Sequence, residues 1–277
     1  MKVNNQPFIA KLRNNKFLIL VHRGSHGGNI IENTSNAVKV SSLQHADMAE
    51  VDISQSTDGD FFIFHDGGEQ RLLDESRNIT TLSTAEIESK SYYNALSEKI
   101  GQKVETFDYL YRHVDHQTFL NVDRSWNYWE TFLPFLDAYQ DMHEYLILKS
   151  PLKREFVQIL NDHSVKYLYF PIVDDLSQLD LLDEFTDLNV VGLELIEATS
   201  SWKLLNSEKL AKYRNGNYML LANSIKLNDS LNLFAGLDDN VALLDSPNKS
   251  WDEMLKLGIN AIQTDWPDIL NEYRKRL

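Results

Sequence analysis

The chain has 277 residues, of which 43% are hydrophobic and 25% charged, so it is long enough for one large domain or two ordinary ones. Its formal net charge of −14 argues against binding to nucleic acid or to an anionic membrane surface, and we expect no nucleic-acid partner. The sequence contains no cysteine, which excludes disulfides and thiolate chemistry.

The N-terminal residues show no targeting pattern. Residues 1–16 lack the apolar core and the small-residue cleavage site of a signal peptide, and no apolar run approaches the roughly 18 residues of a membrane span. We therefore expect a cytoplasmic protein with no integral membrane segment. Residues 1–16 themselves are expected to form an amphipathic extension with a short helix.

Apolar runs with helical patterns between them predict eight strands. The first two are expected at residues 17–21 and 48–54, separated by a helix through residues 37–43 for which Asn33 or Thr34 offers an N-cap. The later strands are expected at residues 118–122, 145–148, 167–170, 190–195, 218–222 and 261–264. Strands that alternate with helices over about 250 residues predict an α/β fold, a single (β/α)8 TIM barrel spanning residues 1–277.

One further apolar run, residues 61–64, does not fit this alternation. It follows the second strand after a short connection with Asp58 and Gly59 at its tip. A parallel crossover needs roughly a dozen residues or more, whereas an Asp-Gly pair between apolar runs indicates a hairpin, so we expect an antiparallel return. The next stretch, about residues 67–116, shows no clear strand and is predicted to be a helical insertion with a capping box that begins at Ser83.

Two carboxylates share one face of the second strand. Side chains two residues apart on a strand point the same way, so Glu50 and Asp52 are expected to lie side by side. Two like charges on an otherwise apolar strand resist burial, and a cation between them would remove that repulsion. Carboxylate oxygens favour Mg²⁺ or Ca²⁺ over zinc. A solvated strand end is the alternative interpretation.

The motifs around these residues follow the order of a known enzyme family. The sequence reads HRG at 22–24, ENT at 32–34, EVD at 50–52, TDG at 57–59, HD at 65–66 and TDWP at 264–267. In order and rough spacing, these motifs resemble those of the glycerophosphodiester phosphodiesterase family, within the phospholipase C-like phosphodiesterase superfamily. The resemblance implies a phosphoric diester hydrolase that binds a divalent cation, Mg²⁺ or Ca²⁺, through E-x-D and a third carboxylate.

Two histidines in these motifs, His22 and His65, are the expected catalytic pair. Cleavage of a phosphodiester requires one group to deprotonate the nucleophile and another to protonate the leaving alkoxide. Histidine suits both tasks because its ordinary pKa is about 6.5. The sequence does not say which histidine is the acid, and two structural histidines with satisfied hydrogen bonds remain the alternative.

The third carboxylate is where this chain departs from the family. The family usually has E-x-K on the next strand, whereas here Asp123 stands at the glutamate position and Ser125 at the lysine position. By the resemblance, Asp123 is expected to be the third metal ligand, with a helix cap as the alternative. Lys149, at the end of a later strand, is expected to supply the missing positive charge to the phosphate.

Two other residues of the motifs are expected near the active site. Arg23 is expected to bind the phosphate, as in HRG proteins generally, although a structural salt bridge is the alternative. Glu32 either contacts the ligand or holds the first loop against the E-x-D strand.

The family often has a tryptophan in a W-T-V-N strand, whereas this chain reads LLANS and keeps only Asn223. We therefore expect the alcohol group of its substrate to differ from that of the common glycerophosphodiesters.

We therefore expect metal-dependent hydrolysis of a small-molecule glycerophosphodiester to glycerol 3-phosphate and an alcohol. Attack by water and attack by a neighbouring hydroxyl of the substrate both fit these residues. One alternative is a phospholipase C- or D-like activity on intact lipid, which the charge of −14 disfavours. Another is a weakly active barrel that binds a phosphorylated ligand, which the replaced E-x-K motif would explain.

Overall fold

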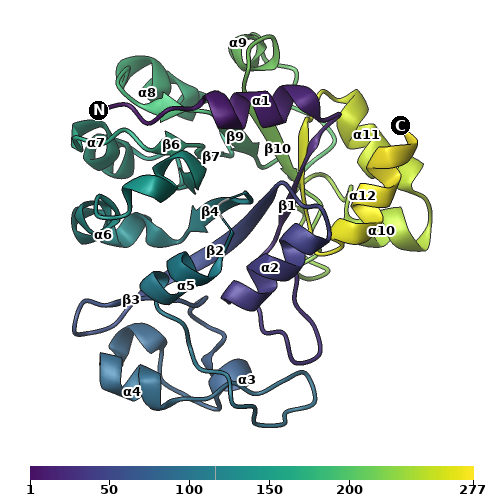
Figure 1. Cartoon of the computed structure of the whole chain (residues 1–277). Coiled ribbons are helices and arrows are strands. Elements are labelled where there is room, and N and C mark those ends of the chain that lie inside the picture. The colour runs from purple at the N-terminus through teal and green to yellow at the C-terminus, as the bar shows by residue number, and fades with distance from the viewer. Residues whose placement is uncertain (116) are drawn as a thin grey trace.

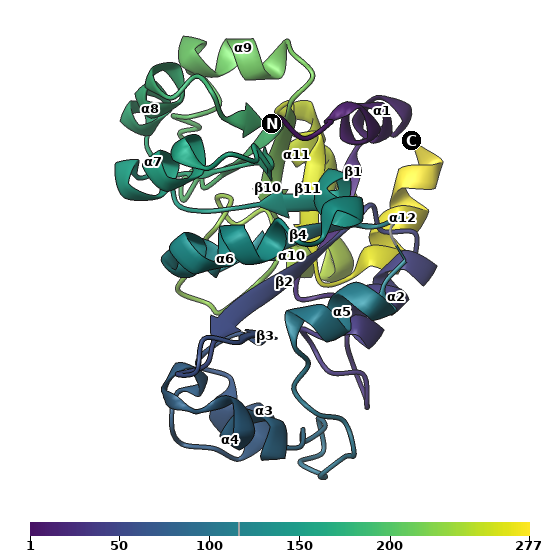
Figure 2. The same ribbon diagram turned by 60° about the vertical axis from the view of Figure 1, so that its left-hand side comes forward.

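A curled parallel sheet wrapped by helices forms the body of the molecule, and a small lobe projects from one end of it (Figures 1 and 2). The computed structural model describes residues 1–115 and 117–277. The last residue of the predicted insertion, His116, therefore lies outside the described residues. Both figures place the lobe beyond the end of the sheet to which strand β2 points.

The parallel sheet closes on itself. Its hydrogen-bonded order is β7-β9-β10-β11-β1-β2-β4-β5-β6-β8. The strands are β1 Leu18–Val21, β2 Met48–Gln55, β4 Phe119–Asp123, β5 Leu146–Leu148, β6 Leu168–Tyr169, β7 Ile172–Val173, β8 Asn189–Val190, β9 Gly192–Leu195, β10 Met219–Asn223 and β11 Ala261–Thr264. Only Val191 separates β8 from β9, so β6 and β7 together pair with one continuous segment. Within the described residues this gives eight strand positions and confirms the (β/α)8 TIM barrel.

The fifth and sixth strand positions are more broken than the sequence predicts. Pro171 lacks an N–H group and divides the fifth position into β6 and β7. Tyr169 pairs with Val190, but Ile172 pairs with Glu194, so the sixth position carries one extra residue between these pairs. Such an extra residue is a β-bulge, and hydrophobic periodicity does not reveal it.

Helices cover the outside of the barrel and one of its ends. They are α1 Gln6–Asn14, α2 Ser35–Leu43, α3 Glu69–Leu73, α4 Thr84–Ser89, α5 Phe107–His113, α6 Trp129–Leu136, α7 Arg154–Asp162, α8 Leu179–Glu184, α9 Ala211–Arg214, α10 Asp239–Leu244, α11 Trp251–Lys256 and α12 Pro267–Arg276. The predicted cap of the second helix is confirmed, because the Thr34 side chain accepts a hydrogen bond from the amide of Ala37. The ring of Phe8 packs edge-on against Phe119 at 5.3 Å, so α1 covers the amino-terminal ends of the strands.

The predicted hairpin is confirmed. Strand β3, Phe61–Ile63, returns antiparallel to β2, with Ile53 opposite Ile63. The segment between β3 and α5 forms the lobe, which carries α3 and α4 and has a small apolar core of its own. This core includes Phe62, Phe64, Leu72, Ile79, Leu82, Ile87 and Tyr92. The predicted capping box at Ser83 and Glu86 is also present, and it starts α4.

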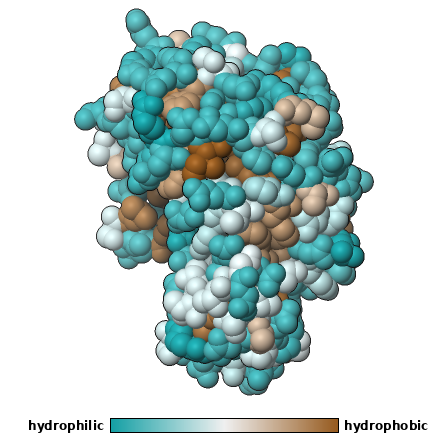
Figure 3. Space-filling model, turned by 90° about the vertical axis from the view of Figure 1, so that its left-hand side faces the viewer, coloured by the Kyte–Doolittle hydropathy of each residue, from teal (hydrophilic) through white to brown (hydrophobic). Residues whose placement is uncertain are grey.

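Hydrophilic side chains cover most of the face shown in Figure 3, with hydrophobic patches on the body above the lobe. Scattered apolar side chains of this kind are normal on a folded protein. Across the described residues, the structure contains no helix that is both long and apolar enough to cross a membrane.

Close contact between β9 and β10 gives a test of the barrel packing. A Cβ atom on Gly192 would lie 2.5 Å from the carbonyl oxygen of Met219, so Gly192→Ala should push the two strands apart. We expect a loss of about 1–3 kcal/mol in the free energy of unfolding, measured by urea denaturation. Gly101→Ala is the control, because no neighbouring atom lies within 4 Å of its Cβ position. Equal midpoints for both variants would contradict this packing.

Candidate active site

The carboxyl ends of the barrel strands surround a cleft of about 200 Å³. Parallel barrels place their chemistry at this end. The cleft brings together all seven residues that the sequence predicts for the site, namely His22, Arg23, Glu50, Asp52, His65, Asp123 and Lys149.

Three carboxylates meet on one side of the cleft. Asp52 pairs with Asp123 across β2 and β4, and Glu50 lies two residues earlier on the same face. One oxygen from each of these residues lies within 4.8 Å of the others. Burial raises the pKa of Glu50 well above its ordinary value, and the charges of Asp52 and Asp123 raise it further. An all-oxygen set of this kind fits Mg²⁺ or Ca²⁺, which would relieve the repulsion.

Lys149 is the cation nearest to this group. It follows β5, its side chain is 3% exposed, and its Nζ lies 2.5 Å from Asp123 Oδ2 and 3.1 Å from Glu194 Oε2. Burial alone would lower the pKa of Lys149, but the charges of Asp123, Glu194 and Glu50 outweigh that effect and raise it. The amine therefore stays charged beside the carboxylates.

Arg23 lies beside Glu50 and Asp52. Its amide donates to Glu50 Oε2 at 2.6 Å, and its Nη1 donates to Glu32 Oε1 at 2.8 Å. Burial would lower the pKa of Arg23, but the charge of Asp52 and the bond to Glu32 raise it. The Nε atom of Arg23 is buried without a hydrogen-bond acceptor among the described residues. Arg23 thus makes the structural salt bridge with Glu32, and its Nε lies 3.5 Å from Asp52 Oδ2 without making a hydrogen bond.

Glu32 links this arginine to the lobe. Its two carboxylate oxygens accept hydrogen bonds of 2.8 and 2.9 Å from Arg71 on α3. Although burial would raise the pKa of Glu32, the bonds and charges of Arg71 and Arg23 lower it to about 2. Glu32 therefore joins the first loop of the barrel to α3 of the lobe.

The two histidines approach the cleft from different elements. His22 directly follows β1, and its Nδ1 lies 3.0 Å from Asp265 Oδ1. The Asp265 amide and the Thr264 hydroxyl both donate to Asp239 Oδ2, at 3.0 and 2.8 Å. Burial raises the pKa of this supporting Asp239 carboxyl to about 6. The TDWP motif therefore serves to hold His22.

The hairpin brings His65 back to the carboxylates. The amide of Phe64, the preceding residue, donates to the carbonyl oxygen of Asp52 at 3.0 Å. His65 therefore enters the cleft beside β2, whereas His22 enters from β1.

Three polar residues support the site without having been predicted to do so. Asn33 bonds Asp52 twice: its Nδ2 donates to Oδ2 at 2.9 Å, and its Oδ1 accepts from the amide at 2.8 Å. Asn223 Nδ2 donates to Glu194 Oε1 at 2.8 Å. The available sequence signal was that Glu194 and Asn223 are polar residues on otherwise apolar strands, at positions that can face the barrel interior.

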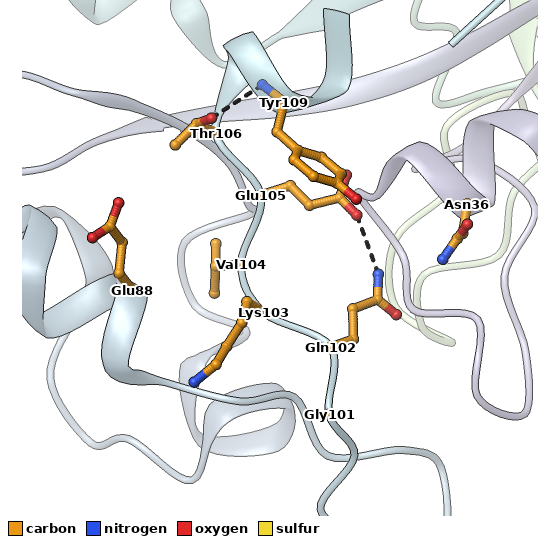
Figure 4. Close-up of a pocket in the computed structure, with 9 residues that line it drawn as sticks. All are labelled: Asn36, Glu88, Gly101, Gln102, Lys103, Val104, Glu105, Thr106 and Tyr109. Carbon is orange, nitrogen blue, oxygen red and sulfur yellow. Dashed lines mark hydrogen bonds between the residues drawn. The ribbon is translucent and has the colours of Figure 1, made fainter. Parts of the chain in front are cut away.

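A larger hollow of about 500 Å³ lies outside the cleft, between the lobe and α2 (Figure 4). Its lining comes from α2, the end of α4, residues 101–106 and α5, and Figure 4 shows Gln102 bonded to Glu105. The Glu105 carboxylate also accepts a bond from the amide of Ser35, at 2.6 Å. None of the predicted site residues lines this hollow, so size alone does not locate the reactive site.

Comparisons with known proteins agree with this geometry. Residues 22–168 match the model of the glycerophosphoryl diester phosphodiesterase family, and residues 169–274 match that of a domain of unknown function. No curated protein matches the sequence.

Among solved structures, a glycerophosphoryl diester phosphodiesterase from Parabacteroides distasonis is 13% identical with a TM-score of 0.77, covering 100% of this chain and 93% of that chain. A glycerophosphodiester phosphodiesterase from Thermotoga maritima is 16% identical with a TM-score of 0.65, covering 93% and 98%. An Oleispira antarctica phosphodiesterase, in complex with the product sn-glycerol-3-phosphate, is 16% identical with a TM-score of 0.64, covering 94% and 97%. These structures share the fold. The family match, residues 22–168, covers more than half of the chain. The chain therefore belongs to the glycerophosphoryl diester phosphodiesterase family, a family of phosphoric diester hydrolases.

Proposed function

We propose that this protein hydrolyses a glycerophosphodiester to glycerol 3-phosphate and an alcohol, using a divalent cation, with His22 and His65 as general acid and base. The observation that carries the proposal is the group of three carboxylates, within 4.8 Å of one another, in a cleft that also contains both histidines. The product bound to the Oleispira antarctica enzyme supports this class of substrate.

Glu50, Asp52 and Asp123 would hold the cation. When bound there, Mg²⁺ or Ca²⁺ neutralises phosphate charge and polarises a phosphoryl oxygen. Asn33 keeps Asp52 in position through its two bonds to that residue. All three ligands come from two adjacent strands, whose register fixes their spacing.

Two cationic side chains would bind the phosphate. The Nε of Arg23 makes no hydrogen bond and can donate to a phosphate oxygen, and Lys149 adds a buried positive charge beside Asp123. Lys149 would thereby replace the family lysine. The residue at that lysine position, Ser125, is instead buried and accepts a hydrogen bond from the indole of Trp129 at 3.0 Å.

The histidines would move the two protons of the reaction. With Nδ1 of His22 directed at Asp265, its Nε2 is the atom left to exchange a proton in the cleft. One histidine takes the proton of the nucleophile, and the other protonates the departing alkoxide. The same pair serves attack by water or by a neighbouring substrate hydroxyl.

We also infer that residues 1–277 form a single catalytic domain with an insertion at about residues 67–116. The lobe begins directly after His65, and its Arg71 bonds Glu32 of the first barrel loop. The insertion would therefore steady the phosphate-binding side of the cleft.

The direct test is release of glycerol 3-phosphate from glycerophosphocholine and glycerophosphoethanolamine with Mg²⁺, with Ca²⁺ and with chelator. We expect turnover only with metal, and a loss of roughly 10²–10⁴-fold in kcat for His22→Ala and for His65→Ala, because each removes one proton transfer. His113→Ala, at an exposed position on α5, should retain wild-type activity. Undiminished turnover in chelator, or in either active-site variant, would contradict the proposal.

Glu32→Gln tests how Arg23 is held. The variant should raise KM and lower the free energy of unfolding by about 1–3 kcal/mol at pH 7, because two arginines lose a buried carboxylate partner. Since the pKa of Glu32 is lowered to about 2, this stabilisation is present above about pH 4.5 and disappears as the pH falls towards 2. Urea unfolding at pH 7 and pH 3 should therefore show a shrinking difference from wild type.

A matched control is Glu130→Gln, which neutralises an exposed carboxylate on α6. It should show no such change between pH 7 and pH 3. If the stability difference caused by Glu32→Gln were the same at both pH values, its ion pairs with Arg23 and Arg71 would not be the source.

A further inference from the structure

The cleft has an apolar side that the proposed reaction does not use. Besides its charged and polar residues, the cleft is lined by Trp126, Ile172, Ile225, Leu227 and Leu233, which we call the apolar wall. Apart from Trp126, its members belong to the part of the chain, residues 169–274, that matches a domain of unknown function.

The loop that carries most of this wall is fixed at several points. It follows β10, where the Ser224 carbonyl oxygen accepts a bond of 2.6 Å from the amide of Asp239. Farther along, the amide of Glu197 donates to the carbonyl oxygen of Leu233 at 3.0 Å. The next residue, Phe234, is buried and packs its ring 5.2 Å from that of Trp202. The loop that carries the apolar wall is therefore held in one conformation by hydrogen bonds and packing.

Leu227 is nevertheless 49% exposed, although it lines the cleft. Leu231, in the same loop, is 43% exposed. When a ligand covers apolar surface beside a reactive centre, binding becomes more favourable in proportion to the apolar area removed from water. The wall is thus suited to an aliphatic group of the substrate.

The charged residues of the cleft also favour an aliphatic group over a cationic one. Its acidic lining residues are Glu50, Asp52 and Asp123, which form the proposed cation site, and Glu194, which is engaged by Lys149 and Asn223. The other charged group near Trp126 is Arg124, whose Nη2 lies 2.6 Å from Asp66. Within the described lining, a choline or ethanolamine group would meet an arginine and one indole, and neither a free carboxylate nor an aromatic cage.

We propose that the preferred substrate is a glycerophosphodiester that carries an aliphatic chain, which lies against the apolar wall while the phosphate is hydrolysed. This inference rests on the proposed function and assigns a role in substrate selection to residues 172–233. The chain could be attached on the alcohol side, as in a glycerophosphoalkanol, or on the glycerol, as in a lysophospholipid. The chemistry recognised by the wall is the same.

The test compares kcat/KM along the series glycerophosphoethanol, -butanol, -hexanol and -octanol, below their micelle-forming concentrations. A second arm compares glycerophosphocholine with monomeric lysophosphatidylcholines of increasing acyl-chain length. We expect kcat/KM to rise about two- to fourfold per methylene until the chain passes Leu227, in at least one arm. The arm in which kcat/KM rises with chain length shows on which side of the phosphate the substrate carries its chain.

Variants locate the effect in the structure. Leu227→Ser should flatten the dependence on chain length, lowering kcat/KM for the octanol diester by about tenfold or more relative to wild type. Leu244→Ser is the matched control: it changes an 85% exposed leucine on α10, which is not part of the cleft lining, and should leave the dependence unchanged.

Several results would overturn the inference. Hydrolysis of short and long diesters at equal rates in both arms would do so while leaving the proposed function intact. A chain-length dependence that survives in Leu227→Ser, or activity that appears only above the micelle-forming concentration, would place the effect outside the apolar wall. No release from any diester by the folded protein would remove the proposed function and this inference together.

Discussion

Mutual repulsion among Glu50, Asp52 and Asp123 is the constraint around which the site is built. Burial and the two neighbouring charges raise the pKa of Glu50 well above its ordinary value. Lys149 and the amide of Arg23 offset part of this repulsion, at 2.5 Å from Asp123 and 2.6 Å from Glu50. Three carboxylates within 4.8 Å of one another, paired with the single lysine Lys149, leave negative charge in excess when they are ionised. A divalent cation is the simplest group that would balance it, and the same ion would attract the phosphate.

The barrel supplies the geometry that this chemistry requires. Side-chain alternation on β2 places two of the carboxylates on one face, and the pairing of Asp52 with Asp123 adds the third. The short β2–β3 hairpin then returns His65 to the same cleft. Strand β11 ends in the motif whose Asp265 holds His22. Most of the reactive groups are therefore fixed by backbone hydrogen bonding, which limits the conformational freedom lost on binding substrate.

Local patterns made much of this predictable. The strand periodicity, the Asp58-Gly59 turn and the E-x-D spacing depend on residues close together in sequence, and the structure contains the corresponding barrel and hairpin. Contacts between distant strands were harder to predict. The contacts of Glu194 with Lys149 and Asn223 depend on which strands face one another across the barrel interior. The two hydrogen bonds from Arg71 to Glu32 depend on how the lobe packs against the first barrel loop. The bulge at Val191 and the path of the loop after β10 follow no hydrophobic period, so pattern analysis could not place them.

The central claim is that Glu50, Asp52 and Asp123 bind a divalent cation together. The most direct measurement is anomalous X-ray diffraction from crystals soaked in Mn²⁺, collected for the wild type and for Asp123→Asn. We expect a wild-type peak about 2.0–2.6 Å from an oxygen of each carboxylate, and a peak that is weak or lost in the variant. A wild-type map with no peak between these three residues, and with Lys149 still bound to Asp123, would contradict it.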